Sequence, residues 1–448
     1  MLGPRLVVAG TCSGSGKTSL ATGLMAALRA RGLEVAAAKV GPDFIDPGYH
    51  QLATGRPGRN LDAWMCGPEL VAPLAGRAAA GADVLVVEGV MGLFDGAADG
   101  TPSSTADIAR LLDAPVVLVV DCSSQAASVA ALVHGFATFD EDLPLAGVIL
   151  NKLASDSHEA MVRRALAEAP VPVPVLGALL RDERFRWRDR HLGLVPVAER
   201  PDEVAASLSA LAELVAERCD LDELVRIARS APPLETGEVP MPAHVGPTRI
   251  AVAGGRAFTF SYPDNLEALG AAGAEIVAFD PLVDEALPAG VDALVVGGGF
   301  PEVMAEQLTA NEPLCRDVRA QIERGLVVWA ECGGLLWLGE ALDGHRMVGA
   351  VKAEAAMTDR LTLGYRTAVL QAATPLGPVG TELRGHEFHY TAMEPAGDAL
   401  LLTGRTGTST GGFGTERLLA SYLHVHLAAR PDLAEAFVAA AIAARTPT

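Results

Sequence analysis

Residues 5–18 read RLVVAGTCSGSGKT, which combines an apolar run typical of a buried strand, a glycine-rich loop and the start of a helical stretch over 18–31. Glycines in such a loop expose successive backbone N–H groups, and the N-terminus of the following helix favours anionic oxygen. An ordinary glycine-rich turn does not require this order of strand, loop and helix. The segment therefore predicts a loop that cradles the phosphates of ATP.

The residues of this loop have expected roles. Lys17 would reach the β- and γ-phosphates, and the hydroxyl of Thr18 would bind Mg²⁺. The glycine that usually stands six residues before the lysine is replaced by Thr11, a departure that resembles the loop of dethiobiotin synthetase. Asn151, at the end of a later strand, would read the adenine edge or serve as a turn residue. The expected nucleotide contacts are Gly10, Thr11, Gly14, Ser15, Gly16, Lys17, Thr18 and Asn151.

Carboxylates at the ends of neighbouring strands are expected to complete the Mg²⁺ site, because this ion prefers oxygen ligands. Asp43 and Asp46 follow the apolar run 33–40, and Glu88 ends the run 83–89. A lone carboxylate at a strand end is often a helix cap. Beside a phosphate loop, we interpret Asp43 and Glu88, together with Thr18, as metal ligands.

The periodicity of the chain predicts two α/β domains. Apolar runs at 5–10, 33–40, 83–89, 114–121 and 145–152 alternate with helical stretches such as 18–31, 68–80, 123–135 and 156–168. Continuous apolar strands between helices indicate a parallel sheet covered on both faces. We therefore expect residues 1–229 to form a doubly wound parallel sheet that carries the phosphate loop.

The composition changes at residues 230–248, which are rich in proline and lack periodicity, so a linker is predicted there. A second series of apolar runs follows, at 249–254, 274–280, 292–299 and 326–330. A single core seldom grows beyond roughly 250 to 300 residues, so a chain of 448 residues is expected to hold two. Residues 249–448 are the second predicted α/β domain.

Charge and cysteine usage exclude several classes of protein. A formal net charge of −20 argues against nucleic acid or an anionic membrane surface as partners, because both require a basic face. No apolar run approaches the roughly 18 residues of a membrane span, and the six cysteines include no C-x-x-C pair. We expect a cytoplasmic protein with reduced thiols, in which an anionic substrate needs a local basic pocket.

The segment AECGG at 330–334 predicts a nucleophile. Cys332 follows the apolar run LVVWA in the small-x-nucleophile-x-Gly form of a sharp strand-to-helix turn. A helix N-terminus favours the thiolate, and a nearby histidine can complete its activation. His424 in SYLHVH is the expected base, with His426 as the second choice. Gly298 and Gly299 of GGGFPE are expected to stabilise an oxyanion.

This second domain resembles the class I glutamine amidotransferases, in which a Cys thiolate attacks the side-chain amide of glutamine and releases ammonia. A carboxylate does not react with ammonia until ATP converts it to an acyl phosphate. An ATP site and an ammonia source in one chain therefore predict amide synthesis. The chain departs from the usual pattern because His426 stands where a Glu is usual, which predicts a Cys–His dyad whose orienting partner is not identified.

Over nearly its whole length, the sequence resembles the cobyrinic and hydrogenobyrinic acid a,c-diamide synthase family of cobalamin biosynthesis. The segments that carry the resemblance are GTCSGSGKTS (10–19), KVGPDFIDPGYH (39–50), RNLDAWM (59–65), VEGVMGLFDG (87–96), RHLGLVP (190–196), AECGG (330–334), RGHEFHY (384–390) and SYLHVH (421–426).

The resemblance implies a carbon–nitrogen ligase that uses Mg²⁺, ATP and glutamine to amidate two acetate side chains of a corrinoid polycarboxylate. It also implies that Asp46 lies near substrate and nucleotide. A homodimer is left open as its assembly. Whether the corrin ring already carries cobalt is left open too, with a weak preference for the metal-free acid because the composition suggests a GC-rich bacterial genome.

Basic residues are expected to hold the substrate carboxylates. The segment 181–191, RDERFRWRDRH, has five arginines against three acids and includes Arg190 and His191. Arg56 and Arg59 are further candidates, although charged runs often form a solvated face. Glu387 and His389 either line a passage between the sites or bridge strands.

Three rival functions follow from parts of the same pattern. Cobyric acid synthase shares both domain types, but the segments 39–48 and 92–96 favour the a,c enzyme. A nickel-sirohydrochlorin a,c-diamide synthase performs identical chemistry on another ring. A partitioning ATPase of the ParA type predicts a second lysine in the phosphate loop and has no use for AECGG, and neither expectation is met.

Overall fold

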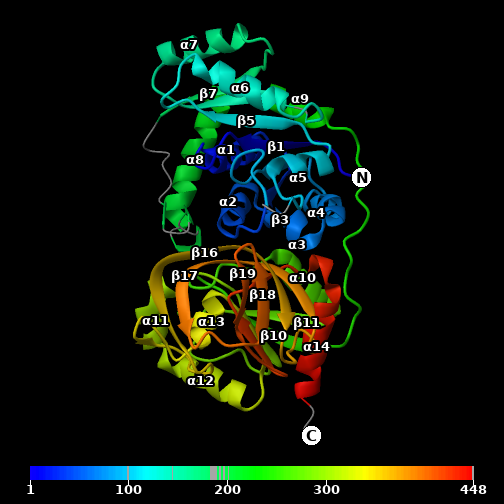
Figure 1. Ribbon diagram of the computed structural model, residues 1–448, viewed down its shortest axis with the longest axis vertical. Coiled ribbons are helices and arrows are strands. Elements are labelled where there is room, and N and C mark those ends of the chain that lie inside the picture. The colour runs from blue at the N-terminus through cyan, green and yellow to red at the C-terminus, as the bar shows by residue number, and fades with distance from the viewer. Residues whose placement is uncertain are drawn as a thin grey trace. The chain divides into compact units, whose positions relative to one another are not determined.

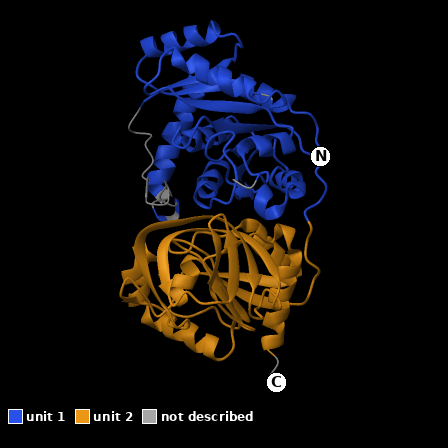
Figure 2. Ribbon diagram, viewed as in Figure 1, with its two compact units in different colours: residues 1–239 blue, residues 240–448 orange. Residues whose placement is uncertain are grey.

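The computed structural model describes residues 1–97, 100–143, 145–181, 189–190, 193–194, 197–199 and 201–445. The chain divides into two compact units, Met1–Val239 and Pro240–Thr448 (Figure 2). The division falls inside the proline-rich segment 230–248. Each unit has its own parallel sheet, so the predicted α/β fold class is confirmed.

Unit 1 is built on a seven-stranded sheet with the order β3-β2-β4-β1-β5-β6-β7, in which every pair is parallel (Figure 1). The strands are β1 (Arg5–Gly10), β2 (Val35–Val40), β3 (Arg59–Leu61), β4 (Val84–Glu88), β5 (Val116–Asp121), β6 (Leu145–Leu153) and β7 (Val175–Leu180). A short pair, β8 (Asp189–Arg190) and β9 (Gly193–Leu194), lies outside this sheet.

Both faces of the sheet are covered, because adjacent residues of β1, β2 and β4 are all buried. A core cluster packs α1, α8 and α9 against one face. The helices of unit 1 are α1 (Lys17–Ala30), α2 (Ile45–Thr54), α3 (Ala63–Cys66), η1 (Pro68–Leu70), α4 (Val71–Ala78), α5 (Thr105–Leu111), α6 (Ser128–Thr138), α7 (Asp156–Ala167), η3 (Val197–Glu199), α8 (Pro201–Arg218) and α9 (Leu221–Ser230).

The strand order places the functional segments of unit 1 side by side. Strand β1 lies between β4 and β5, with Val8 in register with Glu88 and Gly10 in register with Val119. The loop after Gly10 therefore begins at the edge where β4 ends in Glu88. Ligands of doubly wound sheets bind at this carboxyl edge.

Unit 2 contains two larger sheets. The first is six-stranded, in the order β11-β10-β12-β13-β21-β20, and is parallel except for its β20–β21 pair. Its strands are β10 (Thr248–Ala253), β11 (Ala274–Phe279), β12 (Ala293–Val296), β13 (Val327–Glu331), β20 (Phe413–Thr415) and β21 (Leu418–Ser421). The second is dominated by the antiparallel hairpin of β16 (Glu354–Leu370) and β17 (Glu382–Glu394). Its other strands are β14 (Ala341–Leu342), β15 (His345–Arg346), β18 (Leu400–Gly404), β19 (Gly407–Gly411) and β22 (His424–Val425).

Two core clusters cover the faces of the parallel sheet of unit 2. One packs α11, α12 and α13 on one face, and the other packs α10, α14 and the second sheet on the opposite face. The helices are α10 (Pro263–Ala272), η4 (Pro301–Met304), α11 (Ala305–Ala310), α12 (Glu312–Glu323), α13 (Gly333–Leu338), η5 (Leu427–Ala429) and α14 (Pro431–Ala444). The second sheet was not predicted, because 14 of the 17 side chains along β16 are exposed or partly exposed and give no continuous apolar run.

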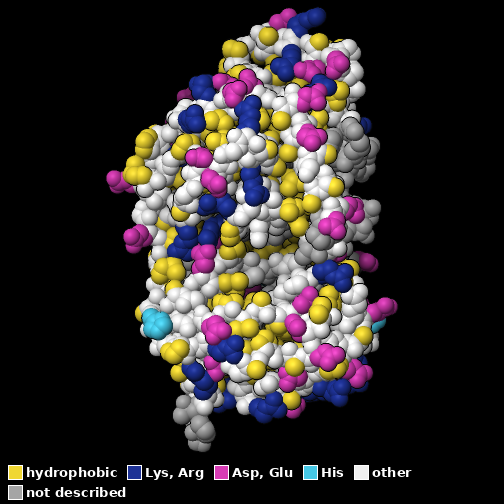
Figure 3. Space-filling view, turned by 180° about the vertical axis from the view of Figure 1, so that it is seen from behind, with side chains coloured by type: hydrophobic (Ala, Val, Ile, Leu, Met, Phe, Trp, Pro, Cys, Tyr) yellow, Lys and Arg dark blue, Asp and Glu magenta, His cyan; other side chains and the backbone are white. Residues whose placement is uncertain are grey.

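The surface carries charges of both signs. On the face shown in Figure 3, Lys and Arg side chains lie interspersed with Asp and Glu side chains. Among the helices that the structure describes, none is both long enough and apolar enough to span a membrane.

Candidate functional site

The phosphate loop of unit 1 has the backbone conformation that its glycines permit. Gly14 and Gly16 have φ values of 76° and 94°, in the left-handed region that favours glycine. A Cβ on Gly16 would lie 2.1 Å from Nδ2 of Asn151. That Nδ2 donates a hydrogen bond to the carbonyl of Ser15 at 2.9 Å. Asn151 thus contacts the backbone of the phosphate loop in this structure.

Three polar side chains surround the loop. Nζ of Lys17 donates to the carbonyl of Cys12 at 3.1 Å, and the hydroxyl of Thr18 donates to Oε1 of Glu88 at 2.6 Å. Nζ of Lys152, the residue after Asn151, donates to the carbonyl of Gly14 at 2.7 Å. The loop is therefore held from β6 as well as from α1.

A buried charge cluster lies beside Thr18. Nζ of Lys39 lies 2.7 Å from Oδ2 of Asp46 and 2.9 Å from Oε1 of Glu88, and all three residues are buried. Burial would raise the pKa of Glu88, but Lys39 and the hydrogen bonds from His50 and Thr18 outweigh it and lower that pKa. Burial and the negative charges of Asp43 and Glu88 raise the pKa of Asp46 well above its usual range. Glu88 is therefore the ionised partner of Lys39, and Asp46 is the carboxyl that protonates more readily.

His50 completes this cluster. Its Nε2 lies 2.6 Å from Oε2 of Glu88, and both side chains are fully buried. The two oxygens of Glu88 thus face different partners: Oε1 faces Lys39 and Thr18, and Oε2 faces His50. Neither Lys39 nor His50 was singled out from the sequence, although both stand in the segment KVGPDFIDPGYH.

Asp43 lies beside this charge cluster, and its carboxylate also contacts the backbone at the start of α2. Its Oδ1 accepts from the backbone N–H of Ile45 at 2.9 Å, and its Oδ2 accepts from that of Asp46 at 3.4 Å. These are contacts of a carboxylate that stabilises the start of α2. Of the two aspartates, the one whose carboxyl lies nearer to Thr18 is Asp46, whose Oδ2 is 3.4 Å from the hydroxyl of Thr18.

The oxygen donors beside the loop fit Mg²⁺, since this ion is usually bound by one or two carboxylates together with substrate phosphates. Thr18, Asp46 and Glu88 supply a hydroxyl and two carboxyl groups within one cluster. Within the described ranges, no three or more His, Cys, Asp and Glu side chains form a group that could hold a metal ion by themselves. A hydroxyl and two carboxyl groups would suit a metal that is also bound by the phosphates of a nucleotide.

The basic residues predicted to hold substrate are only partly described. Arg56 donates to the backbone carbonyls of Ala78, at 3.4 Å, and Ala80, which ties it to the end of α4. Arg59 is buried in β3. His191 lies outside the described residues, and of Arg190 only the backbone, in β8, is described.

Cys332 in unit 2 lies at the sharp turn that its sequence predicts. It follows the last residue of β13 and caps the N-terminus of α13, with φ 47° and ψ −103°. A positive φ is costly for a residue with a Cβ and is found at functional turns. Gly333 and Gly334 permit the turn, because a Cβ on Gly334 would lie 2.3 Å from the carbonyl of Val296.

His424 is brought to Cys332 by β21, which pairs with β13 and places Ser421 opposite Glu331; His424 itself lies in β22, opposite His386 of β17. The imidazole is buried and hydrogen-bonds the side chain of Cys332. Burial lowers the pKa of His424, but hydrogen bonds with Cys332 and Glu331 outweigh burial and raise it to about 10. The structure therefore brings together the predicted nucleophile and base, with the base in its protonated form at neutral pH.

The alternative base, His426, has different surroundings. Its ring stacks on Tyr262 with centroids 4.6 Å apart, and its Nδ1 accepts from the N–H of Ala428 at 3.3 Å. Asn265, which the sequence analysis passed over, holds the segment between these elements. It donates to the carbonyl of Val425 at 2.7 Å and accepts from the N–H of Leu427 at 2.8 Å.

The predicted oxyanion glycines lie against the nucleophile turn. A Cβ on Gly298 would lie 2.6 Å from Cε1 of His424, and a Cβ on Gly333 would lie 2.9 Å from N of Gly299. The N–H of Gly298, however, donates to the carbonyl of Phe260 at 3.1 Å. Gly299 thus remains the better placed donor of the two.

Side chains of β17 surround this site. The ring of His386 stacks on His424 with centroids 4.9 Å apart, and that of His389 stacks on Tyr422 at 3.7 Å. Glu387 forms an ion pair with Arg366 of β16 at 2.8 Å. Glu387 therefore bridges strands, which is one of the two roles considered for it.

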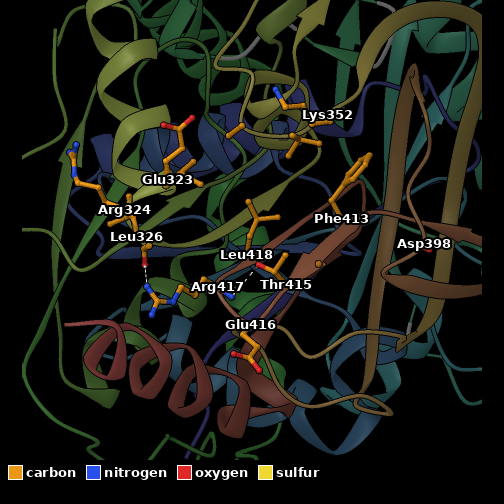
Figure 4. Close-up of a pocket in the computed structure, with 15 residues that line it drawn as sticks. Glu323, Arg324, Leu326, Lys352, Asp398, Phe413, Thr415, Glu416, Arg417 and Leu418 are labelled. Atoms are coloured by element: carbon orange, nitrogen blue, oxygen red, sulfur yellow. Dashed lines mark hydrogen bonds between the residues drawn. The ribbon is translucent and has the colours of Figure 1, made fainter. Parts of the chain in front are cut away.

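A separate hollow of about 810 Å³ is lined by side chains that include Glu323, Lys352 and Phe413 (Figure 4). It lies at the start of β13, whereas Cys332 follows the end of that strand. Leu326 before β13, the end of α12 and the β20–β21 turn line it, and Arg417 donates there to the carbonyl of Gly325 at 3.2 Å. It contains none of the predicted site residues.

Two family models match the chain. The CobQ/CobB/MinD/ParA nucleotide binding domain matches residues 6–195, and the CobB/CobQ-like glutamine amidotransferase domain matches residues 249–432. The first contains the phosphate loop, and the second contains Cys332 and His424. Unit 1 is therefore a nucleotide-binding domain and unit 2 a glutamine amidotransferase domain.

Curated relatives match over nearly their full length. Hydrogenobyrinate a,c-diamide synthase of Streptomyces coelicolor is 52% identical, with 97% of each chain covered. The protein of the same name from Thermobifida fusca is 48% identical over 98% of this chain and 96% of that one. Cobyrinate a,c-diamide synthase of Syntrophotalea carbinolica is 46% identical over 97% of this chain and 98% of that one. With such identity over both domains, the chain belongs to the family of hydrogenobyrinate and cobyrinate a,c-diamide synthases.

Proposed function

We propose that the protein converts the a and c acetate carboxylates of hydrogenobyrinic acid to amides, with ATP to activate them and glutamine as nitrogen donor. The observation that carries the proposal is the buried Cys332–His424 pair in a chain that also holds a phosphate loop. Hydrogenobyrinic acid is preferred over cobyrinic acid because the relatives at 52% and 48% identity carry that name, against 46% for a cobyrinate enzyme.

The reaction in unit 1 activates the acid. An oxygen of the substrate carboxylate attacks the γ-phosphorus of ATP, and the bond to the β-phosphate oxygen breaks to give an acyl phosphate and ADP. Lys17 stabilises the charge that develops on the transferred group. Ammonia then attacks the acyl carbon, phosphate leaves, and the amide forms with loss of a proton.

Mg²⁺ would be held by Thr18, Asp46 and Glu88, and it supplies charge neutralisation for the phosphates when bound. The residues around it keep these donors in place. Lys39 spans the two carboxyl groups, and His50 orients Glu88 through its other oxygen. A buried carboxylate held by several partners in this way changes position little when ligands bind, and the three partners of Glu88 leave a lone pair for the metal.

Unit 2 supplies the ammonia. The thiolate of Cys332 attacks the side-chain carbonyl carbon of glutamine, and the N–H groups of Gly299 and Gly333 stabilise the oxyanion. Gly333 has a suitable N–H because the first residues of a helix have no intrahelical acceptor. The imidazolium of His424 gives its proton to the leaving nitrogen, so that ammonia departs and a thioester remains. His424 then accepts a proton from the water that hydrolyses the thioester to glutamate.

The cellular compartment is inferred from these substrates. ATP and glutamine are cytoplasmic metabolites, and six free cysteines suit a reducing compartment. We therefore place the protein in the cytoplasm, without nucleic acid or membrane among its partners. The homodimer that the sequence left open is decided by sedimentation of the purified chain.

A substrate panel tests the proposal. The purified chain is incubated with Mg²⁺, ATP and glutamine, and separately with hydrogenobyrinic acid, cobyrinic acid, nickel-sirohydrochlorin and the a,c-diamide that cobyric acid synthase extends. Mass spectrometry counts the amides formed. Two amides on hydrogenobyrinic acid, with a higher kcat/KM than on the others, support the proposal. A higher kcat/KM on another acid would contradict the proposal and identify that acid as the substrate.

A further inference from the structure

Glu331 is the residue directly before the nucleophile, and it reaches the segment that carries the base. It ends β13 and is buried, with a relative exposure of 6%. Its Oε1 accepts from the backbone N–H of Val425 at 2.9 Å. Its Oε2 lies 3.5 Å from Nδ1 of His424. One carboxylate thus contacts both the backbone after the base and the ring of the base.

The base His424 needs a partner that orients its ring. A general base works only if its ring is held in one orientation and tautomer, and a carboxylate on the far nitrogen commonly provides this. Two residues after the base stands His426, whose Nδ1 accepts from Ala428 and whose ring stacks on Tyr262. His426 cannot supply the carboxylate that is usual at that position.

We propose that Glu331 is the positioning residue of the amidotransferase site. It precedes the nucleophile Cys332 in the chain, and it orients the ring of His424 as a Glu two residues after the base usually does. With Nδ1 of His424 toward Glu331, Nε2 is the nitrogen left for the thiol of Cys332. The distance of 3.5 Å is long for a hydrogen bond, but catalytic bonds often tighten when substrate binds. The inference rests on the proposed glutaminase function of Cys332.

The other groups around His424 do not provide an equivalent charge. Burial and the neighbouring His424 lower the pKa values of His386 and His389, so both rings are neutral near pH 7. Glu387 is occupied by the guanidinium of Arg366. The titratable and charged groups that face His424 from the surrounding elements are Glu331, Cys332, His386, Glu387 and His389. Glu331 is the carboxylate among them whose oxygen approaches the ring.

The test uses the full chain and the variant Glu331→Gln, which keeps the acceptor for the N–H of Val425 and removes the charge. The kcat for glutamine hydrolysis should fall about 10- to 100-fold, with KM for glutamine changed less than about twofold. Synthesis driven by ammonium salt should stay unchanged. The control Glu387→Gln removes a neighbouring carboxylate that is paired elsewhere, and it should cost less kcat.

A second measurement needs no folded variant. In the wild-type chain with Cys332 alkylated by iodoacetamide, Glu331 is the remaining group that raises the pKa of His424 against the effect of burial, and we expect that pKa to stay above its ordinary value of 6.5. Carbon-13 NMR of labelled histidine rings measures this pKa. A pKa below 6.5 in the alkylated chain overturns the inference, as does wild-type kcat in Glu331→Gln.

Different results would contradict the glutaminase function of Cys332 and the positioning role of Glu331. If Cys332→Ala retains glutamine hydrolysis, the proposed function of the thiol is wrong, whatever Glu331 does. If Cys332→Ala is inactive with glutamine and Glu331→Gln is fully active, only the role of Glu331 is wrong. The variant Glu331→Asp, with the charge kept but withdrawn by one methylene, should have intermediate kcat; activity equal to that of Glu331→Gln contradicts a role for the charge.

Discussion

Nζ of Lys39 lies 2.9 Å from Oε1 of Glu88 inside unit 1, and both side chains are buried beside the phosphate loop. The same Nζ lies 2.7 Å from Asp46. Two carboxyl groups that are proposed to face Mg²⁺ are thus kept together by a cation of the protein itself. This arrangement makes the carboxyl edge of the sheet sensitive to changes of charge.

Replacing Lys39 by Met should destabilise unit 1, because it leaves two buried carboxyl groups without their cation. Breaking a buried pair in this way costs about 3–5 kcal/mol. Urea unfolding measures the loss. Lys352→Met is the matched control, since its pair with Glu340 is exposed and such pairs contribute about 0–1 kcal/mol. Equal losses in the two variants would show that the buried cluster is not held by Lys39.

Replacing Lys17 by Ala should abolish diamide formation with glutamine and with ammonia, because both routes pass through the acyl phosphate. A loss of at least about 100-fold is expected from removing a group that stabilises transition-state charge. Release of glutamate from glutamine, measured on the same sample, is the control and should persist. Diamide synthesis by this variant at saturating ATP would disprove the phosphate-loop assignment.

Glu88→Gln should raise the Mg²⁺ concentration for half-maximal activity by at least about tenfold, because it removes an anionic oxygen donor. Asp43→Asn keeps the acceptor that stabilises the start of α2 and should shift this concentration little. A Mg²⁺ titration of both variants distinguishes the ligands. A larger shift for Asp43→Asn would restore the metal role that the sequence first suggested.

Much of the fold could be predicted from the sequence, because many of its strands are identified by their own residues alone. Buried parallel strands are continuous apolar runs, so β1, β2, β4, β5 and β6 were expected close to their observed bounds. The hairpin of β16 and β17 was not expected, because its residues are partly exposed and polar. Its prediction needs the partner strand, which a local pattern does not contain.

The functional residues also divide into those that a local sequence motif identifies and those that only the fold brings together. Lys17, Thr18 and Cys332 stand in local motifs whose turn geometry follows from their own glycines. Glu331 and His424 are 93 positions apart and meet through the pairing of β13 with β21, which places Glu331 opposite Ser421, three residues before His424. Lys39 and His50 were overlooked because a buried Lys or His has no local signature; the partners that justify each one come from other strands.

The acid stability of unit 2 should depend on His389. Burial lowers the pKa of this ring to about 4, although a hydrogen bond to the carbonyl of Thr391 opposes the shift. The unfolded chain, with a pKa near 6.5, therefore binds the extra proton between about pH 6.5 and 4, so stability falls as pH falls through this window. The contribution is on the order of 3 kcal/mol.

His389→Gln should reduce this dependence, and the part due to His386, whose pKa burial also lowers, should remain. Urea midpoints of the unit 2 transition between pH 4 and 7 measure the change. His345→Gln, at the partly exposed strand β15, is the control and should keep the wild-type slope. A slope in His389→Gln equal to that of the wild type would assign the effect to another group.

The division of labour between the two units is tested most directly by Cys332→Ala, assayed with two nitrogen sources. Removing the thiol should stop the glutamine-dependent reaction and leave acyl-phosphate formation intact, because that step uses residues of unit 1. Cys315→Ala, which removes another thiol of unit 2, should behave as the wild type. With glutamine, Cys332→Ala should make no diamide; with ammonium salt at alkaline pH, where more of it is free ammonia, it should make the a,c-diamide at the wild-type rate. Normal use of glutamine by this variant, or failure of ammonia to restore synthesis in a folded sample, would contradict the account.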